Sequence, residues 1–249
     1  MKRILTLAMM LTLVLLPLGC GHTPAATAGD AVAVLLPPSA GNAVEATAGD
    51  ASAADAGVEV QSYDELISAL NDTSVARAHI SADITISSAE EQTFEREGFV
   101  LVVDEGATVT FDQGLILVFC GSDEEPGIVV NGTLKVAGTL NFGAMTLMNN
   151  GTLEVLSGGT LAPGMSTMEN YGTVVVDQGG EIRLERGSSL QNFANVVNQG
   201  TIQITDDGGS LYNSPEATLK NDGHIAFDGN YQNEGTYTGG EEEPQGAMG

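Results

Sequence analysis

The stretch Asn149-Asn150-Gly151-Thr152-Leu153 decides how the rest of this sequence is interpreted. It contains an Asn, a variable residue, a Gly, a Thr and an apolar residue, and this phrase recurs at irregular intervals of roughly 20 residues. The later copies, one with His in place of Thr, are Asn170-Tyr171-Gly172-Thr173-Val174, Asn198-Gln199-Gly200-Thr201-Ile202, Asn221-Asp222-Gly223-His224-Ile225 and Asn233-Glu234-Gly235-Thr236-Tyr237. Such a repeat indicates β-structure that coils, with connecting loops of different length.

The residues after each Gly alternate between polar and apolar, as they do in the segments 152–155 and 201–204. This period-two alternation predicts short strands that have one buried face. Strands of this length cannot form a core singly, so each coil must cover the apolar face of the next. We therefore predict an all-β protein, a right-handed parallel β-helix (β-solenoid) over residues 58–238. An all-β sandwich with ordinary N-x-G turns is the alternative.

The repeated Asn and Gly residues are expected to form the corners of the coils. A tight corner needs a positive φ, which Gly supplies without steric cost. Asn side chains at equivalent corners of successive coils can hydrogen-bond one another as a ladder. The predicted corner ladder comprises Asn149, Asn170, Asn198, Asn221 and Asn233, together with Gly151, Gly172, Gly200, Gly223 and Gly235.

Residues 1–20 have the features of an export signal. Lys2 and Arg3 precede an apolar run, Ile4–Leu16, that is too short for a comfortable membrane span. The end of the segment, Gly19-Cys20, resembles a bacterial lipobox. This resemblance implies that Cys20 becomes the lipidated first residue of the mature chain. We expect an exported protein, anchored to a membrane by lipid in the bacterial cell envelope or at the cell surface. A plain signal peptide cut elsewhere, or an uncut anchor, is the alternative.

Two further segments lack the residues that a core needs. Residues 21–57 are rich in Ala, Gly and Pro, so we predict a disordered linker. Residues 239–249 include three consecutive Glu and are predicted to form a flexible acidic tail.

An N-terminal capping helix is predicted near residues 62–71. Ser62 and Glu65 have the spacing of a capping box. One face of the helix would contain Tyr63, Leu66, Ile67 and Leu70. Because the first coil of a solenoid exposes an apolar end, this helix is a suitable lid. A helix that binds a partner is the alternative.

The segment from Val58 to Ile86 combines a short strand, this helix and the alternating strand that starts at His79. It resembles the amino-terminal entry of pectate-lyase-like right-handed parallel β-helices. The N-x-G-T phrases resemble the repeats of β-helical bacterial surface proteins and autotransporter-type adhesins. Together these resemblances imply a fold more firmly than an activity.

The charge of the chain argues against two classes of partner. It contains 33 acidic and 8 basic residues, which gives a formal net charge of −25. Such a surface repels the phosphates of nucleic acids and of anionic lipids. We therefore expect no nucleic-acid partner.

A pectate-lyase-like enzyme would need basic groups that neutralise a uronate and abstract its proton, often with calcium held by carboxylates. The basic residues in the coil region are Arg96, Lys135, Arg183, Arg186 and Lys220. Only Arg183 and Arg186 are close in sequence, and Glu181 and Glu185 beside them favour surface ion pairs. His224 occupies the Thr position of a repeat and is expected to be an outward strand residue. We assign no catalytic residue.

No metal ligand and no redox-active residue is assigned either. Acidic turns at residues 123–125, 177–180 and 206–209 offer oxygens for calcium but lack the nine-residue repeat of calcium-binding rolls. No cofactor is therefore predicted. Cys120 is expected to be a buried thiol, and a disulfide with Cys20 is the alternative. Thr152, Thr173 and Thr201 are expected to form one outward row at most, which argues against an ice-binding surface.

These observations favour a non-catalytic cell-surface module that is adhesin-like or contacts a polysaccharide. Its partners would be a glycan or a host or cell-surface protein. The competing interpretation is a β-helical polysaccharide lyase or hydrolase that acts on acidic glycans.

Overall fold

The computed structural model describes residues 57–87, 92–112, 115–120 and 126–240. These ranges contain one α-helix and 24 strands. The expected export signal with Cys20, most of the expected linker and residues 241–249 lie outside the described residues, as does the side chain of Cys120.

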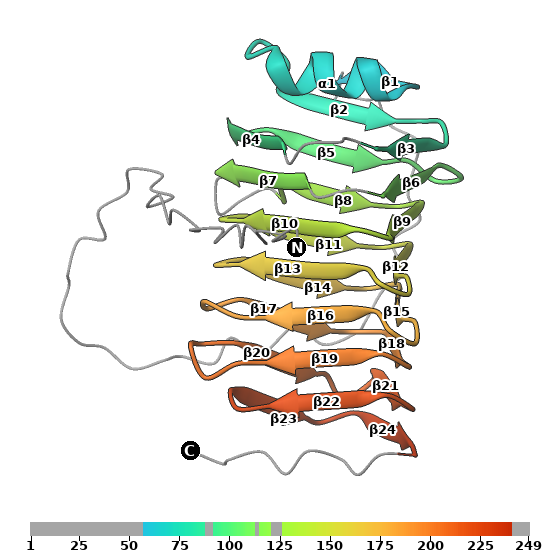
Figure 1. Ribbon diagram of the computed structural model, residues 1–249, viewed down its shortest axis with the longest axis vertical. Helices are drawn as coiled ribbons and strands as arrows, with labels where there is room; N and C mark the ends of the chain where they lie inside the picture. The colour runs from blue at the N-terminus through green and yellow to red at the C-terminus, as the bar shows by residue number, and fades with distance from the viewer. Residues whose placement is uncertain (1–56, 88–91, 113–114, 121–125, 241–249) are drawn as a thin grey trace, which may run out of the picture. The chain divides into compact units, whose positions relative to one another are not determined.

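The described strands wind into a right-handed parallel β-solenoid of about eight coils. Figure 1 shows the strands of successive coils stacked above one another, and every strand pairing is parallel. Each coil contributes one strand to each of three sheets, here named A, B and C. The prediction of an all-β parallel β-helix is therefore confirmed, and the β-sandwich alternative is wrong.

The three sheets differ slightly in length. Sheet A contains β1 (Val58–Val60), β2 (Arg77–Ile80), β5 (Val100–Val103), β8 (Ile128–Val130), β11 (Thr146–Asn149), β14 (Thr167–Asn170), β17 (Ser189–Asn192), β20 (Ser210–Asn213) and β23 (Asn230–Asn233). Sheet B contains β3 (Ile84–Ile86), β6 (Thr108–Phe111), β9 (Thr133–Val136), β12 (Thr152–Val155), β15 (Thr173–Val176), β18 (Asn195–Asn198), β21 (Thr218–Asn221) and β24 (Thr236–Gly239). Sheet C contains β4 (Gln92–Glu97), β7 (Leu115–Cys120), β10 (Thr139–Gly143), β13 (Thr160–Gly164), β16 (Glu181–Leu184), β19 (Thr201–Ile204) and β22 (His224–Phe227).

The alternating residues of these strands produce one continuous core. Leu153 lies opposite Val174 in sheet B, and Ile202 lies opposite Ile225 in sheet C. All four belong to the same buried cluster. Because the strands pair without a slip of register, every second residue faces inward, and full burial of each such side chain contributes about 1.5–3 kcal/mol.

The capping helix α1 (Tyr63–Asn71) lies at the N-terminal end of the stack (Figure 1). Ser62 is its N-cap, and the Ser62 hydroxyl oxygen accepts a hydrogen bond of 3.3 Å from the Glu65 N–H. The Glu65 carboxylate accepts from the N–H of Gln61 rather than from that of the N-cap residue itself. The buried face consists of Leu66, Ala69 and Leu70, while Ile67 of the predicted face is only half-buried.

Arg96 on β4 connects this helix to the coils through hydrogen bonds. Its guanidinium donates hydrogen bonds to the carbonyl oxygens of Ala69 (3.0 Å) and Leu70 (2.8 Å) and to that of Val75. It also lies over the ring of Phe99, 4.7 Å from the ring centroid. A cation is favourable at the C-terminal end of a helix, where carbonyl groups lack intrahelical partners. Arg96 therefore has a structural role.

Candidate functional site

The corner between sheets A and B is held by a ladder of Asn side chains, all buried except the half-buried last one. Each ladder residue ends a strand of sheet A, and the Nδ2 atom of each of the first four donates a 2.7 Å hydrogen bond to the Oδ1 atom of the next. The members in order are Asn149, Asn170, Asn192, Asn213 and Asn233. Because the amides all point the same way along the axis, their hydrogen bonds reinforce one another.

A second ladder lies at the corner between sheets B and C. The Nδ2 atom of Asn198 donates to Oδ1 of Asn221 over 2.7 Å, and Nδ2 of Asn221 donates to the hydroxyl of Tyr237. The prediction of one ladder through Asn149, Asn170, Asn198, Asn221 and Asn233 is therefore wrong, since these residues are divided between two corners.

Two ladder members do not match the repeated Asn-x-Gly-Thr phrase. Asn192 and Asn213 are followed, two residues on, by Ala194 and Pro215 instead of Gly. The repeated phrase therefore did not include them, although the strand register places both in the ladder.

The corner glycines are required for a different reason from the one predicted. Gly151, Gly172, Gly200, Gly223 and Gly235 are all absent from the positive-φ glycines of the described chain. They lie instead directly against the backbone of the preceding coil: a Cβ atom on Gly172 would lie 2.2 Å from the carbonyl oxygen of Gly151. The close stacking of one corner on the next therefore excludes a side chain.

The ladder positions an aromatic pair on the outside of the same corner. Tyr171 and Phe193 each follow a ladder Asn, and their rings stack with centroids 4.9 Å apart and planes inclined by 10°. Tyr171 is 48% exposed, which makes it one of three exposed large hydrophobic side chains in the described chain. Phe193 is half-buried beneath this exposed ring, and an aromatic stack at the surface marks a candidate binding surface.

Polar side chains on the outer face of sheet A adjoin the stack. Glu169, Gln191, Tyr212 and Gln232 lie opposite one another on β14, β17, β20 and β23. With Tyr171, Phe193 and Glu234 they form a surface that we name the corner strip. It runs along the solenoid axis over four coils.

Two phenol–carboxylate pairs belong to the corner strip. The Tyr171 hydroxyl donates to Glu169 Oε2 over 3.3 Å, and the Tyr212 hydroxyl donates to Glu234 Oε2 over 3.0 Å. Gln232 Nε2 also donates to Glu234 Oε1, over 2.7 Å. Partial burial, followed by the nearby carboxylate of Glu169, raises the pKa of Tyr171. Burial and the hydrogen bond to Glu234 raise the pKa of Tyr212, so both phenols are neutral at physiological pH.

The chemistry of the corner strip is that of recognition. Aromatic rings offer apolar contact area with little loss of side-chain entropy, and amide and carboxylate groups exchange hydrogen bonds with hydroxyl groups. Sequence inspection missed Tyr171, Phe193 and Tyr212 because only the three-dimensional register brings them together. The available signal was an aromatic residue directly after an Asn, at Tyr171 and Phe193.

The candidate catalytic and ionic residues are dispersed. The Arg183 guanidinium contacts Glu181 at 2.9 Å, as predicted, and Arg186 lies 3.8 Å from Glu185. Further pairs join Lys135 to Glu154 and Lys220 to Asp222. His224 is exposed at the first position of β22. Among the described residues, no group of three or more His, Cys, Asp or Glu side chains is placed to hold a metal ion.

The Thr residues singled out in the sequence do not share one row. Thr152 and Thr173 lie opposite each other in sheet B, and their row continues through Thr133. Thr201 belongs to sheet C, where its neighbours are Glu181 and His224.

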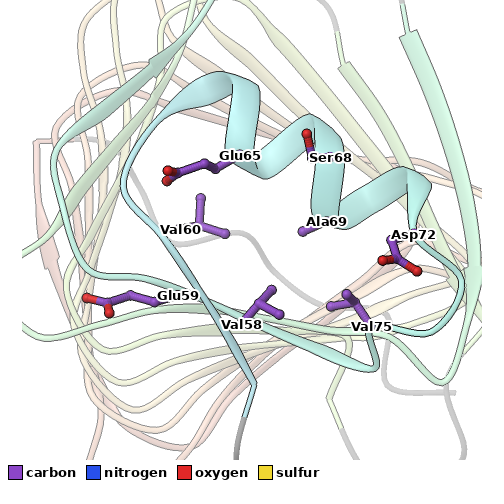
Figure 2. Close-up of a pocket in the computed structure, with 8 residues that line it drawn as sticks. All are labelled: Val58, Glu59, Val60, Glu65, Ser68, Ala69, Asp72 and Val75. Carbon is purple, nitrogen blue, oxygen red and sulfur yellow. The ribbon is translucent and has the colours of Figure 1, made fainter.

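A hollow of about 230 Å³ lies between α1 and β1 (Figure 2). It is lined by Val58, Glu59, Val60, Glu65, Ser68, Ala69, Asp72 and Val75. Its carboxylates already have local partners. The Ser81 hydroxyl, with Gln61, lowers the pKa of Glu59, and the side chain and N–H of Ser74 lower that of Asp72. These acids therefore stabilise the cap, and the corner strip remains the stronger candidate.

Comparison with known proteins adds no assignment. Within the described part of the chain, no helix has the length and apolar character needed to cross a membrane. No family model, curated protein or solved structure matches this chain.

Proposed function

We propose that this protein is an exported, non-catalytic surface module whose solenoid contacts a polysaccharide through the corner strip. The observation that carries the proposal is the Tyr171–Phe193 stack, in which Tyr171 is exposed and Phe193 half-buried, bordered by amide and carboxylate groups on the same face. A sugar ring presents C–H groups on its faces and hydroxyls on its rim. The corner strip offers complementary groups to both.

The rigidity of the underlying coils supports this function. Association costs free energy when side chains and loops must become ordered. In the corner strip, the Asn ladder and the sheet register already fix the backbone of every contributing residue. A surface that is organised before it binds loses less conformational entropy on binding. Even a shallow strip can therefore retain a polymer that contacts it at several points.

The distribution of charge favours binding over catalysis. A lyase or hydrolase for acidic glycans needs acids and bases that converge on one position of the substrate. The described basic side chains of the central coils instead lie in separate, partly exposed ion pairs, such as Lys135–Glu154 and Arg183–Glu181. The enzyme remains the competing hypothesis, with polygalacturonate as the substrate that would reveal it.

Retention on immobilised polysaccharides tests the proposal. We expect the exported chain to be retained on at least one glycan, and the double variant Tyr171→Ala/Phe193→Ala to lose retention by about tenfold. Met165→Ala is the matched control, because Met165 is 58% exposed at a different corner. Release of unsaturated or reducing ends from polygalacturonate would contradict the non-catalytic proposal.

The export and anchoring part of the proposal rests on the sequence of residues 1–20. We propose that Cys20 carries the lipid and that the linker separates the solenoid from the membrane. A bacterial host that expresses the chain should incorporate a labelled fatty acid into it, and Cys20→Ser should abolish the label and release the protein from membranes. Unchanged labelling of Cys20→Ser would contradict the assignment.

A further inference from the structure

We propose that the corner strip binds an uncharged β-1,4-linked polysaccharide chain that lies parallel to the solenoid axis. This inference rests on the proposed function and specifies its ligand class. The residues involved are Glu169, Tyr171, Gln191, Phe193, Tyr212 and Glu234, all of which lie on four successive strands of sheet A or at the corners that follow them.

The direction of the bound chain follows from the strip itself. Adjacent strands lie 4.7–4.9 Å apart, so four coils span roughly 15 Å along the axis. Across the axis, the corner strip is only as wide as the outer positions of one strand and the corner residue after it, as in Glu169 and Tyr171. A linear polymer that follows the axis contacts all four coils, whereas a chain that crosses the axis contacts one or two.

The charge of the corner strip selects the ligand class. Glu169 and Glu234 are acidic, and the other named members are neutral. Uronates and sulfated sugars would therefore meet two carboxylates without a cation from the strip to neutralise them. Carboxylate oxygens that already accept one phenol hydrogen bond retain lone pairs that can accept from sugar hydroxyls. The excess of acidic over basic residues in the chain adds to the repulsion of anionic glycans.

The spacing of the two phenols along the axis selects the linkage. Tyr171 belongs to the coil of β14 and Tyr212 to the coil of β20, two coils further on. Two coils correspond to about 10 Å, the length of roughly two pyranose rings. In a β-1,4-linked chain each ring is turned over relative to the last, so the same edge returns at every second ring. In the first pair the phenol lies at the corner and the carboxylate on the strand, and in the second pair this order is reversed. The two phenols, two coils apart, are therefore the groups that meet the recurring edge, with Gln191 and Phe193 facing the ring between them.

The test compares hexasaccharides by isothermal titration calorimetry with the purified exported chain. The probes are a β-1,4-linked glucose hexamer, a β-1,3-linked glucose hexamer and a galacturonic acid hexamer. We expect the β-1,4-linked glucose hexamer to bind at least about tenfold more tightly than either of the others. Tyr171→Ala/Phe193→Ala should weaken it by about tenfold or more, and Tyr212→Phe, which keeps the ring, by about threefold. Met165→Ala should bind as the parent does.

A charge variant provides a second test that does not depend on removing an aromatic ring. Glu169→Gln/Glu234→Gln keeps the size of both side chains and should bring the affinity for the galacturonic acid hexamer to within about threefold of that for the glucose hexamer. Retained discrimination against the uronate in this variant would overturn the electrostatic argument.

The possible outcomes separate the inference from the proposed function. Strip-dependent binding that favours the uronate or the β-1,3-linked hexamer overturns this inference and leaves the polysaccharide-contacting function standing. Binding that survives in Tyr171→Ala/Phe193→Ala, with the variant folded by circular dichroism, removes the corner strip as the site. Failure to bind any of the glycans, immobilised or free, overturns both.

Discussion

The Nδ2 atom of Asn192 lies 2.7 Å from the Oδ1 atom of Asn213, one coil further along the solenoid, and donates a hydrogen bond to it. Asn170 and Asn192 have the same relationship one coil earlier. The ladder starts at Asn149, whose Oδ1 atom is buried without a hydrogen-bond partner in the described chain, because Val130 lies opposite it in β8. The ladder therefore has a defined direction and a defined end.

This direction predicts unequal effects of ladder mutations. Asn192→Ala removes the donor to Asn213 Oδ1 and the acceptor of Asn170 Nδ2, and an unsatisfied buried group costs about 1–3 kcal/mol. Asn149→Ala should cost at least about 1 kcal/mol less, because it also removes an oxygen that has no partner. Urea unfolding of both variants measures the difference. Equal destabilisation would contradict the role assigned to the ladder.

The cost of replacing a glycine by Ala should depend on how close the added Cβ atom would lie to the backbone of the preceding coil. Gly172→Ala would place Cβ 2.2 Å from the Gly151 carbonyl oxygen, so we expect a loss of at least about 3 kcal/mol or failure to fold. Gly164 has no atom within 4 Å of the equivalent position and no positive φ, which makes it the matched control. Gly164→Ala should be neutral or stabilise by about 0.5 kcal/mol. Thermal unfolding midpoints compare the two, and a well-folded Gly172→Ala would show that the corner can expand.

A row of strained residues lies at the corner between sheets C and A. Ala144, Met165 and Arg186 have φ values of 55°, 51° and 54° on successive coils. The left-handed conformation costs about 1–2 kcal/mol for such residues, and the entropic cost of Gly offsets part of the relief. Met165→Gly should therefore stabilise by about 0.5–1 kcal/mol. Ala162→Gly, within β13, should destabilise by a similar amount, and urea unfolding that ranks the two in the opposite order would contradict the assignment of strain.

Arg96 should stabilise the capping helix α1 without changing the stability of the central coils. Arg96→Ala removes the donors to the last carbonyls of α1, so we expect a loss of about 3 kcal/mol that is confined to the cap. Hydrogen exchange should accelerate within Tyr63–Asn71 and remain unchanged in β15–β19. Arg183→Ala is the control, since its partly exposed pair with Glu181 contributes at most about 1 kcal/mol. Uniform acceleration along the solenoid would show that the cap and the coils unfold together.

The two tyrosines of the corner strip should lose their phenol protons at a higher pH than an ordinary tyrosine. Their pKa values are raised in the folded protein, so the folded state retains these protons as the pH rises past the ordinary value of 10. The stabilisation that results is fully present below pH 10 and is lost as the pH rises through the folded values. Tyrosinate absorbance of the parent minus that of Tyr171→Phe/Tyr212→Phe should have a midpoint above pH 10. A midpoint at or below 10 would contradict the environment described for these rings.

The sequence predicted the fold because the strand pattern is local, whereas the ladder and the binding strip are not. Alternation at Thr152–Val155 is enough to identify a strand that has one buried face. Equivalence between corners depends on how many residues each loop contains, so Asn198 was grouped with Asn170 although the two lie at different corners. Tyr171 and Phe193 are 22 positions apart, and only the register of sheet A brings their rings together.

The corner glycines illustrate a second limit of sequence-based inference. Gly in a turn is compatible both with positive φ and with close backbone approach, and the sequence does not distinguish them. At Gly172 the structure shows close approach to Gly151, a contact between coils that no single repeat contains. Similarly, the chain could not reveal that Arg96, on β4, contacts the end of α1.

The central claim is that the aromatic rings of the corner strip contact an uncharged glycan. Tyrosine-ring-labelled NMR of the exported chain, titrated with the β-1,4-linked glucose hexamer, tests it most directly, because the five tyrosines of the chain can be assigned by single Phe substitutions. We predict saturable shifts of Tyr171 and Tyr212, with little change at Tyr63 in the distant cap. Unchanged signals from Tyr171 and Tyr212 at saturating glycan would contradict the account.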